Sequence, residues 1–308
     1  MARPKEWQKQ KQQNKFWKRL KILMSDLQKK LLKALIVGKP NVGKSTLLNF
    51  LVGEKVSIVS RKAQTTQKNT TGVITKDDSQ LIFFDTPGLN KIEKNIRISE
   101  NFKAVAENVD VLFYMVDNRK KSQSIDDHFS NWLNKNQSRF KKKILIVNKI
   151  DCIEKVKLFE ITKTINGIIN FDETFFISLR KKSGLESFYK WIEKQAYSND
   201  WVFQKRYKSN IGKKTFLSEL TREKIFEYIH EEIPYNLEVK TEYIEPTNRK
   251  SLKIYQTVWL NKKSYKPIIL GKEGKSIKTI SVQARQDMES FLKSKVHLFI
   301  RLKIKKSG

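Results

Sequence analysis

The chain has 308 residues, which is room for about two domains, and 39% of them are hydrophobic, enough for a sizeable core. It carries 63 Lys+Arg against 32 Asp+Glu, a formal net charge of +31. So large an excess indicates a polyanionic partner, which is nucleic acid in the first place and an anionic membrane surface in the second. A single cysteine, Cys152, excludes an internal disulfide and a Cys-rich metal centre, and three His argue against a His-based site.

Residues 1–30 are predicted to form a basic N-terminal tail. Residues 1–33 carry 11 Lys/Arg and two acids, without the long apolar run of a secretory signal. We expect a solvated segment, partly helical around residues 17–27, that adds nonspecific affinity for RNA. An organelle transit peptide is the alternative. No stretch of 18 apolar residues occurs in the chain, so no transmembrane helix is expected.

Residues 31–198 alternate short apolar runs with amphipathic stretches. The runs predicted as strands are 31–37, 71–75, 80–84, 111–116, 144–147 and 174–177. The stretches predicted as helices are 45–51, 98–108, 126–135, 156–169 and 185–195. Buried strands that alternate with helices are typical of βαβ units, so we expect an α/β domain with a mostly parallel sheet flanked by helices.

The C-terminal part is predicted to be a second, more basic α+β domain over residues 215–308. Residues 197–214 are polar, aromatic and basic, and we place a linker at 199–214. Residues 201–308 carry 24 Lys/Arg against 11 acids. The predicted elements are a helix over 216–232, strands over 238–244 and 252–260, a helix from the turn at 271–274 to 292, and a strand over 296–304.

Residues 38–45, GKPNVGKS, fit the pattern G-x-x-x-x-G-K-[ST] between a predicted strand and a predicted helix. In that context the glycines let backbone N–H groups surround phosphate oxygens, and the helix adds its positive end. Lys44 would contact the β- and γ-phosphates, and Ser45 would bind Mg²⁺. The candidate phosphate-binding residues are Gly38, Lys39, Pro40, Asn41, Val42, Gly43, Lys44, Ser45 and Thr46.

The sequence Asn148-Lys149-Ile150-Asp151 follows a buried strand and is the candidate guanine reader. The Asp151 carboxylate can accept hydrogen bonds from N1–H and the exocyclic amine of guanine, which adenine does not present together. Asn148 and Lys149 belong to the same candidate site. Without the preceding phosphate loop, this tetrapeptide would be read as a solvated loop.

Asp85-Thr86-Pro87-Gly88 lies between these two motifs, again at the end of a predicted strand. Asp85 would hold Mg²⁺ through water, and the Gly88 N–H would meet the γ-phosphate, so the loop would respond to hydrolysis. The candidate nucleotide-binding residues in this loop are Asp85, Thr86, Pro87, Gly88 and Leu89.

The order GKPNVGKST, DTPG, NKID resembles a translation-factor-type GTPase domain, and residues 60–66, SRKAQTT, resemble the first switch of the bacterial Era family. The resemblance implies that Thr66, or Thr65 as the alternative, serves the Mg²⁺ and γ-phosphate side. It also implies a guanine contact at Ser178-Leu179, where the family has Ser-Ala. The implied catalytic residues are Lys44, Thr66 and Gly88, and the implied metal ligands are Ser45, Thr66 and Asp85.

Intrinsic hydrolysis is expected to be slow. Leu89 stands where Ras-like enzymes have the glutamine that positions water, and Arg97 is only an outside candidate for a cis arginine finger. By resemblance to related GTPases, Asn41 would help to bind an activating K⁺, which would supply positive charge near the phosphates. Simple turn propensity is the alternative explanation for Asn41.

Residues 271–274, GKEG, form a G-x-x-G loop at the start of a predicted helix. The element order around it is that of a type II KH domain, in which such a loop clamps about four single-stranded nucleotides. Alone, the tetrapeptide would be a plain turn. The bases would lie in a groove lined by Ile268, Ile269, Ile277 and Ile280. The candidate RNA-binding residues are Gly271, Lys272, Glu273, Gly274, Lys275 and Lys278.

Further stretches that resemble Era are 222–225, 232–235, 269–278, 284–288 and 296–298. The resemblance therefore covers residues 33–305. It implies a GTPase that uses GTP/GDP, Mg²⁺ and K⁺, binds the 3′ region of small-subunit (16S) ribosomal RNA and assists maturation of the 30S subunit. A second hypothesis is an RNA-binding assembly chaperone that binds GTP but scarcely hydrolyses it. We expect a cytoplasmic monomer, with peripheral membrane contact left open, and Cys152 packed beside the nucleotide loop.

Overall fold

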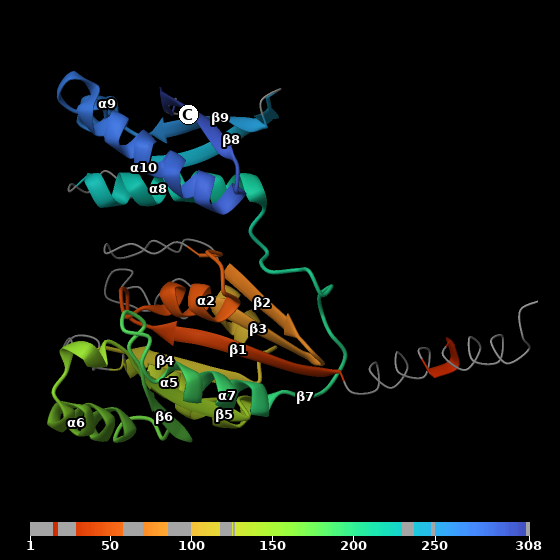
Figure 1. The fold of residues 1–308 in the computed structure, drawn as a ribbon. Coiled ribbons are helices and arrows are strands. Elements are labelled where there is room, and N and C mark those ends of the chain that lie inside the picture. The colour runs from red at the N-terminus through yellow and green to blue at the C-terminus, as the bar shows by residue number, and fades with distance from the viewer. Residues whose placement is uncertain are drawn as a thin grey trace, which may run out of the picture.

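The structure is a computed structural model that describes residues 15–17, 29–57, 70–85, 100–117, 125, 127–229, 237–247 and 250–305. The chain forms an α/β unit followed by a smaller α+β unit, joined by an extended segment (Figure 1). The predicted fold class is confirmed in both units. No described helix is long and apolar enough to cross a membrane.

The sheet of the α/β unit has the strand order β2-β3-β1-β4-β5-β6, with β7 paired to the start of β1. Its strands are β1 (Lys30–Gly38), β2 (Thr70–Lys76), β3 (Ser79–Asp85), β4 (Val111–Val116), β5 (Lys142–Val147), β6 (Glu173–Phe176) and β7 (Tyr197–Ser198). Strands β3, β1, β4, β5 and β6 run parallel, whereas β2 is antiparallel to β3. The carboxyl ends of the parallel strands therefore meet at one edge, where the three predicted nucleotide motifs begin.

Helices cover both faces of this sheet. They are α2 (Lys44–Val52), α3 (Glu100–Ala106), α5 (Asp127–Lys135), α6 (Lys155–Asn166) and α7 (Leu185–Gln195), with short 3₁₀ turns η1 (Gln137–Arg139) and η2 (Ile150–Cys152). Alternate residues of β1 enter the two opposite cores: Ala34 packs in the core of α2 and α7, and Leu35 in that of α3, α5 and α6. β4 is buried along its whole length, which explains its uninterrupted apolar sequence.

The segment predicted as a linker is packed on the sheet rather than free of it. The rings of Phe203 and Tyr207 stack with centroids 4.3 Å apart and lie against the small core that contains Val73 and Ile82. Gln80 donates to the carbonyl of Phe203 at 2.8 Å and accepts from its N–H at 3.0 Å. The segment that connects the two units is therefore held on the α/β unit, because the Phe203 and Tyr207 rings pack against β2 and β3.

The α+β unit has a three-stranded sheet of order β10-β9-β8. Its elements are α8 (Lys213–Tyr228), β8 (Leu237–Pro246), β9 (Ser251–Leu260), α9 (Tyr265–Leu270), the turn η4 (Lys272–Gly274), α10 (Lys275–Leu292) and β10 (Lys295–Ile304). β8 and β9 are antiparallel, and β9 and β10 are parallel. The short helix α9 was missed by the sequence analysis, which read its residues only as a groove wall.

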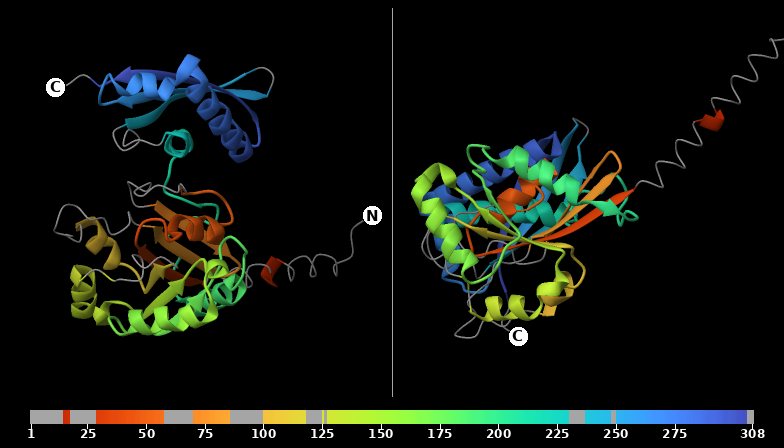
Figure 2. Two further views of the ribbon diagram at one scale, coloured as in Figure 1. Left: turned by 90° about the vertical axis from the view of Figure 1, so that its left-hand side faces the viewer. Right: turned by 90° about the horizontal axis from the view of Figure 1, so that it is seen from below.

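Helices α8 and α10 pack on one face of this sheet, where Leu220, Ile254 and Ala284 share a buried core. A polar network joins α8 to the same face: Thr221 Oγ1 donates to Gln256 Oε1 at 2.6 Å, and Gln256 Nε2 donates to the Leu217 carbonyl at 2.9 Å. Figure 2 shows α8 on the side of the sheet nearer the α/β unit. The two units therefore approach each other through α8.

One group of charged side chains, the Lys55 cluster, links the two units. Lys55 Nζ lies just after α2, 2.6 Å from Glu223 Oε2 on α8 and 3.4 Å from Asp287 Oδ2 on α10. Lys224 Nζ completes the cluster, 3.2 Å from Asp287 Oδ2. Burial raises the pKa of Glu223, an effect that the charge of Lys55 opposes. Lys55 thus neutralises a carboxylate that the fold of the second unit buries.

Candidate nucleotide and RNA sites

The phosphate loop runs from the end of β1 into α2, and two of its glycines have no room for a side chain. A Cβ on Gly38 would lie 2.4 Å from the Met115 carbonyl oxygen, and one on Gly43 would lie 2.4 Å from Asn148 Nδ2. Gly43 also has a φ of 111°, a region that L-residues rarely adopt. The loop is therefore held against β4 and against the Asn148 motif.

Lys44 is buried inside this loop. Its Nζ donates to the carbonyl of Gly38 at 2.9 Å and to that of Lys39 at 3.1 Å. The ammonium group therefore lies over the centre of the turn, where P-loop lysines meet phosphate oxygens. Asn41, with a φ of 64°, makes the tight bend that brings the loop back toward α2.

Ser45 and Asp85 come together at the start of α2. Ser45 Oγ donates to Asp85 Oδ2 at 2.6 Å, and Ser57 Oγ lies 3.3 Å from the same oxygen. Asp85 is completely buried, and among the described residues its other carboxylate oxygen, Oδ1, has no hydrogen-bond partner. Burial raises the pKa of Asp85, while Lys44 and the two hydroxyls oppose that shift. A buried carboxylate with an unsatisfied oxygen beside a serine hydroxyl fits the oxygen ligands that Mg²⁺ takes.

The guanine motif is tied to the phosphate loop. Asn148 Nδ2 donates to the Val42 carbonyl at 2.8 Å, and Lys149 Nζ donates to the Asn41 carbonyl at 2.9 Å. Lys149 also forms an ion pair of 2.7 Å with Asp117, which is fully buried. Asp117 was not predicted as a site residue, although an acidic residue directly after the buried strand 111–116 was a usable signal.

Asp151 is exposed and is oriented by the next loop. Ser178 Oγ donates to Asp151 Oδ1 at 2.6 Å, and this bond is the main reason why the pKa of Asp151 is lowered. The Leu179 N–H donates to Asn148 Oδ1 at 3.3 Å. The Ser178-Leu179 pair thus supports both side chains of the guanine motif, even though a leucine replaces the usual alanine. The Asp151 carboxylate is ionised at neutral pH and can accept from two N–H donors.

Cys152 is exposed, so the expectation that it packs beside the nucleotide loop is wrong. The turn η2 leaves its Sγ on the surface, 3.6 Å from Asp151 Oδ2. In the described part of the chain, no group of three or more His, Cys, Asp or Glu could hold a metal ion.

Several predicted residues of the switch loops lie outside the described residues. They are Thr65, Thr66, Thr86, Pro87, Gly88, Leu89 and Arg97. The described residues of the candidate nucleotide site are therefore the phosphate loop, Asp85, the Asn148 motif and the Ser178 pair. These four come from the ends of β1, β3, β5 and β6.

The G-x-x-G loop connects α9 to α10 through three residues with positive φ: Gly271 (70°), Glu273 (53°) and Gly274 (75°). A Cβ on Gly271 would lie 2.2 Å from Ser276 Oγ, whereas Gly274 faces open space. Lys272, Lys275 and Lys278 are exposed, and Lys275 pairs with Glu273 at 3.2 Å. Three cations therefore gather at the N-terminal end of α10, where a phosphate would offset their unfavourable interaction with the helix dipole.

The predicted apolar groove is only partly formed by the expected side chains. Ile268 is exposed and Ile277 is half-buried, but Ile269 and Ile280 are completely buried in the core of the second unit. The prediction is wrong for those two residues, because α9 and α10 turn them toward the sheet. The groove beside the loop is left to Ile268 and Ile277.

The chain matches two families, described as "50S ribosome-binding GTPase" over residues 33–149 and "KH domain" over residues 232–308. Among curated proteins it is 35% identical to GTPase Era of Ehrlichia canis over 292 residues, 92% of this chain and 95% of that protein. It is 32% identical to GTPase Era of Sinorhizobium medicae over 274 residues, 88% and 87% of the two chains.

Two solved structures have a similar fold over both units, each with a TM-score of 0.76 and 31% identity. One is Era in complex with MgGDPNP and nucleotides 1506–1542 of 16S ribosomal RNA, matched over 91% of this chain and 95% of that one. The other is Aquifex aeolicus Era Y63A bound to GDP·AlF4⁻, matched over 90% and 95%. With a phosphate loop, a guanine motif and a G-x-x-G loop placed in one such fold, the chain belongs to the GTPase Era family.

Proposed function

We propose that this GTPase is a nucleotide-controlled RNA-binding protein that holds the 3′ region of 16S ribosomal RNA and assists maturation of the 30S subunit. The observation that carries the proposal is the likeness, over 91% of this chain, to Era bound to MgGDPNP and nucleotides 1506–1542 of that RNA. The geometry of both loops supports it, since each can meet an anionic ligand through backbone N–H groups and lysines.

For the nucleotide, Lys44 binds the β- and γ-phosphates, and Asp151 with Asn148 reads guanine. Ser45 and Asp85 hold Mg²⁺, which neutralises charge on the phosphate oxygens when it is bound. The free oxygen of Asp85 and its contact with Ser45 support this assignment. Thr66 and Gly88 complete the γ-phosphate side, and Asn41 contributes to a K⁺ site that would raise the rate of hydrolysis.

For the RNA, the loop Gly271–Gly274 clamps the backbone of a single strand, and Lys272, Lys275 and Lys278 neutralise its phosphates. We divide the chain into a basic tail (1–30), a GTPase domain (31–198), a linker (199–214) and a KH domain (215–308). The protein acts as a cytoplasmic monomer, and its basic tail allows peripheral contact with the inner face of the cell membrane.

Two measurements test the proposal: the rate of single-turnover GTP hydrolysis, and the affinity of the chain for the 1506–1542 RNA fragment. The full chain should bind the fragment more tightly with a non-hydrolysable GTP analogue than with GDP, and K⁺ should accelerate hydrolysis relative to Na⁺. Equal RNA affinity in both nucleotide states would refute the switch. RNA binding together with GTP binding but no turnover, with or without K⁺ and 30S particles, would instead support the chaperone hypothesis.

A further inference from the structure

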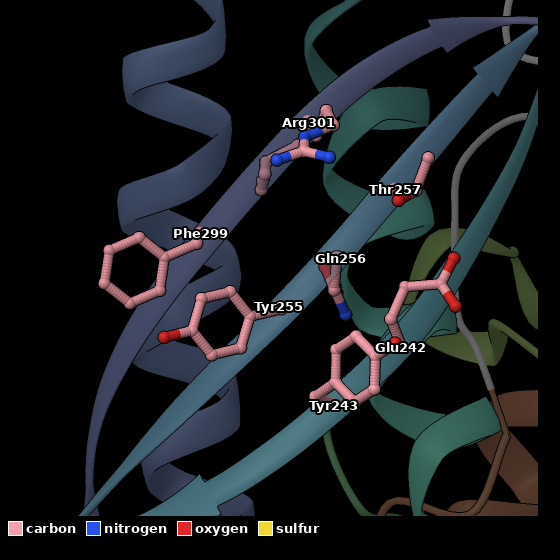
Figure 3. A pocket seen from close by; sticks show the side chains of 8 residues that line it. Glu242, Tyr243, Tyr255, Gln256, Thr257, Phe299 and Arg301 are labelled. Atoms are coloured by element: carbon pink, nitrogen blue, oxygen red, sulfur yellow. The ribbon is translucent and has the colours of Figure 1, made fainter.

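The sheet of the second unit has one face that no described helix covers. Because side chains alternate along a strand, Ile254 and Val258 of β9 point to the helices, while Lys253, Tyr255 and Trp259 point the other way. Figure 3 looks onto this face, with the helices behind the strands. We call it the open sheet face.

An aromatic row crosses the open sheet face in register. Tyr243 of β8 pairs with Tyr255 of β9, which pairs with Phe299 of β10. The rings of Tyr255 and Phe299 are stacked, with centroids 4.9 Å apart and an interplanar angle of 14°. Tyr243 is 63% exposed and Phe299 is 47% exposed, so this is an aromatic surface and not a core.

A bulge places Tyr243 in this row. The pairing shifts between Thr241 and Tyr243, so that the strand has one extra residue, Glu242, at this point. Thr241 is buried toward α8, and without the extra residue Tyr243 would point to the same side as Thr241. Lys214 at the start of α8 donates to the Glu242 carbonyl at 2.6 Å and fixes the bulge. The fold thus exposes a third aromatic ring that a regular strand would bury.

Cations flank the row on the same face. Phe299 is followed two and four residues later by Arg301 and Lys303, and Lys253 lies beside Tyr255. Within the described residues, Lys253 and Arg301 have no ion pair with a carboxylate. Of the acids on the neighbouring strand, Glu242 pairs with Lys240 at 3.3 Å and Glu238 pairs with Lys305 at 3.0 Å. Glu245 is the cross-strand neighbour of Lys253, so Arg301 and Lys303 carry the excess positive charge. The net charge of the face is therefore positive.

A shallow pocket of about 350 Å³ lies between the aromatic row and Arg301. Its lining residues are Glu242, Tyr243, Tyr255, Gln256, Thr257, Phe299, Ile300 and Arg301. Figure 3 shows the Tyr255 and Phe299 rings turned with their faces toward the viewer, and Arg301 at the far side of the pocket. The volume is at the lower end of the range for ligand pockets and is open on the solvent side.

We propose that the open sheet face is a second binding site for single-stranded RNA, separate from the G-x-x-G loop, in which one or two bases stack on Tyr255 and Phe299 while Arg301 and Lys253 bind the flanking phosphates. Exposed aromatic rings flanked by cations suit a single strand of RNA, because stacking on a ring is independent of base identity and the cations attract the phosphates. For a protein partner, cations on both sides of the aromatic row would add little binding free energy.

The two RNA sites lie on opposite sides of one sheet, since the G-x-x-G loop begins α10 on the covered face. A strand held by the loop must pass around the edge of the sheet to reach the aromatic row. This inference rests on the proposed RNA-binding function. It can be tested independently of the G-x-x-G loop, because the loop and the open sheet face share no residues.

The test uses the full chain and a 5′-labelled single-stranded oligouridylate, measured by anisotropy over a salt titration. Phe299→Ala should weaken binding by about 5- to 150-fold, the effect of losing one base–aromatic stack, and Phe299→Trp should retain binding. Arg301→Ala should reduce the slope of log affinity against log salt by about 0.7. The matched control is Phe159→Ala, which removes an exposed Phe from α6 in the other unit and should change nothing.

Gly274→Asp distinguishes the two sites. If the open sheet face binds RNA, Phe299→Ala should weaken binding in the Gly274→Asp background as well, and ultraviolet crosslinking should label the peptides of β9 and β10. Unchanged affinity and no such crosslink in Phe299→Ala and Arg301→Ala would overturn this inference while the G-x-x-G loop stands. An effect of Phe299→Ala without any effect of Gly274→Asp would support the open sheet face and remove the loop from the proposed function.

Discussion

At the scale of single residues, the candidate nucleotide site depends on carboxylates with opposite environments. Asp85 is buried with its pKa raised, and Asp151 is exposed with its pKa lowered. In the protein alone, the buried charge of Asp85 lowers the stability of the fold, whereas in the presence of a cation the carboxylate can act as a ligand. Asp151 is ionised without assistance and is ready to accept hydrogen bonds. Substitution of each acid by its amide should therefore have a different result.

Asp151→Asn should shift nucleotide preference from GTP toward XTP by about 10²-fold or more, because the amide presents a donor to the exocyclic amine of guanine. Competition binding with the two nucleotides measures the shift. Asp200→Asn, an exposed change far from the loop, is the matched control. Retained GTP preference in Asp151→Asn would show that this side chain does not read the base.

Asp85→Asn should raise the melting temperature of the nucleotide-free protein and abolish the Mg²⁺ dependence of GTP binding. The folded-state pKa of Asp85 lies above its unfolded value, so its charged form destabilises the fold at neutral pH, and that cost disappears as pH falls through the folded pKa. The amide carries no such charge. Thermal unfolding from pH 4 to 8 should thus show a pH-dependent gap between the two proteins. A lower melting temperature at neutral pH would contradict this account.

At the scale of elements, local backbone patterns were predictable and long-range contacts were not. The loops at 38–45 and 271–274 are encoded by glycines at fixed spacing, and both were located from sequence. The two-residue strand β7 and the six-residue helix α9 were missed. Runs this short show no periodic pattern, and they form through contacts with residues far away in the sequence. Ile269 and Ile280 were placed in the groove because a period of 3.6 shows that a helix has an apolar side, not which neighbour covers it.

The G-x-x-G element can be tested with a pair of glycines. Gly274 and Gly53 have nearly equal φ values, 75° and 76°, and a Cβ on either would meet nothing within 4 Å. Gly274→Asp and Gly53→Asp should therefore each lower the free energy of unfolding by about 1 kcal/mol and lower the melting temperature by similar amounts. Only Gly274→Asp should remove most binding of the 1506–1542 RNA fragment. Equal RNA affinity in both variants would make Gly271–Gly274 a plain turn.

Lys272→Ala in the same loop should act more mildly. It removes one phosphate contact, so the affinity for all single strands should fall alike and the salt slope should decrease by about 0.7. A salt titration with two unrelated RNA sequences measures both effects. Loss of affinity for only one of the two sequences would mean that Lys272 reads bases.

At the scale of the whole molecule, the Lys55 cluster is a contact between the two units that a single substitution can break. Lys55→Ala leaves Glu223 buried without its strongest partner, which costs more than the loss of an exposed pair. We expect the two units to separate, measured by small-angle scattering or by fluorescence transfer between labels. Lys76→Ala removes an ion pair within the α/β unit, with Glu193 at 3.2 Å, and should leave the distance unchanged.

Reciprocal coupling gives a second readout for the same variant. If the contact transmits nucleotide state, Lys55→Ala should reduce the ratio of RNA affinities with GTP analogue and with GDP, and it should reduce the effect of RNA on nucleotide affinity by the same factor. A ratio that stays unchanged while the units separate would show that the cluster holds the units together without transmitting the signal.

The packed segment 197–212 determines how much free energy is needed to undock the second unit from the first. Phe203 and Tyr207 anchor the segment to the sheet, so the chain leading into α8 starts from a fixed point and the second unit stays tethered to the first when the ion pairs are broken. The tether gives the second unit a high effective concentration at its docking position, so docking is an intramolecular equilibrium. An intramolecular equilibrium near unity needs only about 1–2 kcal/mol to change from mostly docked to mostly undocked. Movement of a few side chains beside a nucleotide could therefore reposition an entire RNA-binding unit.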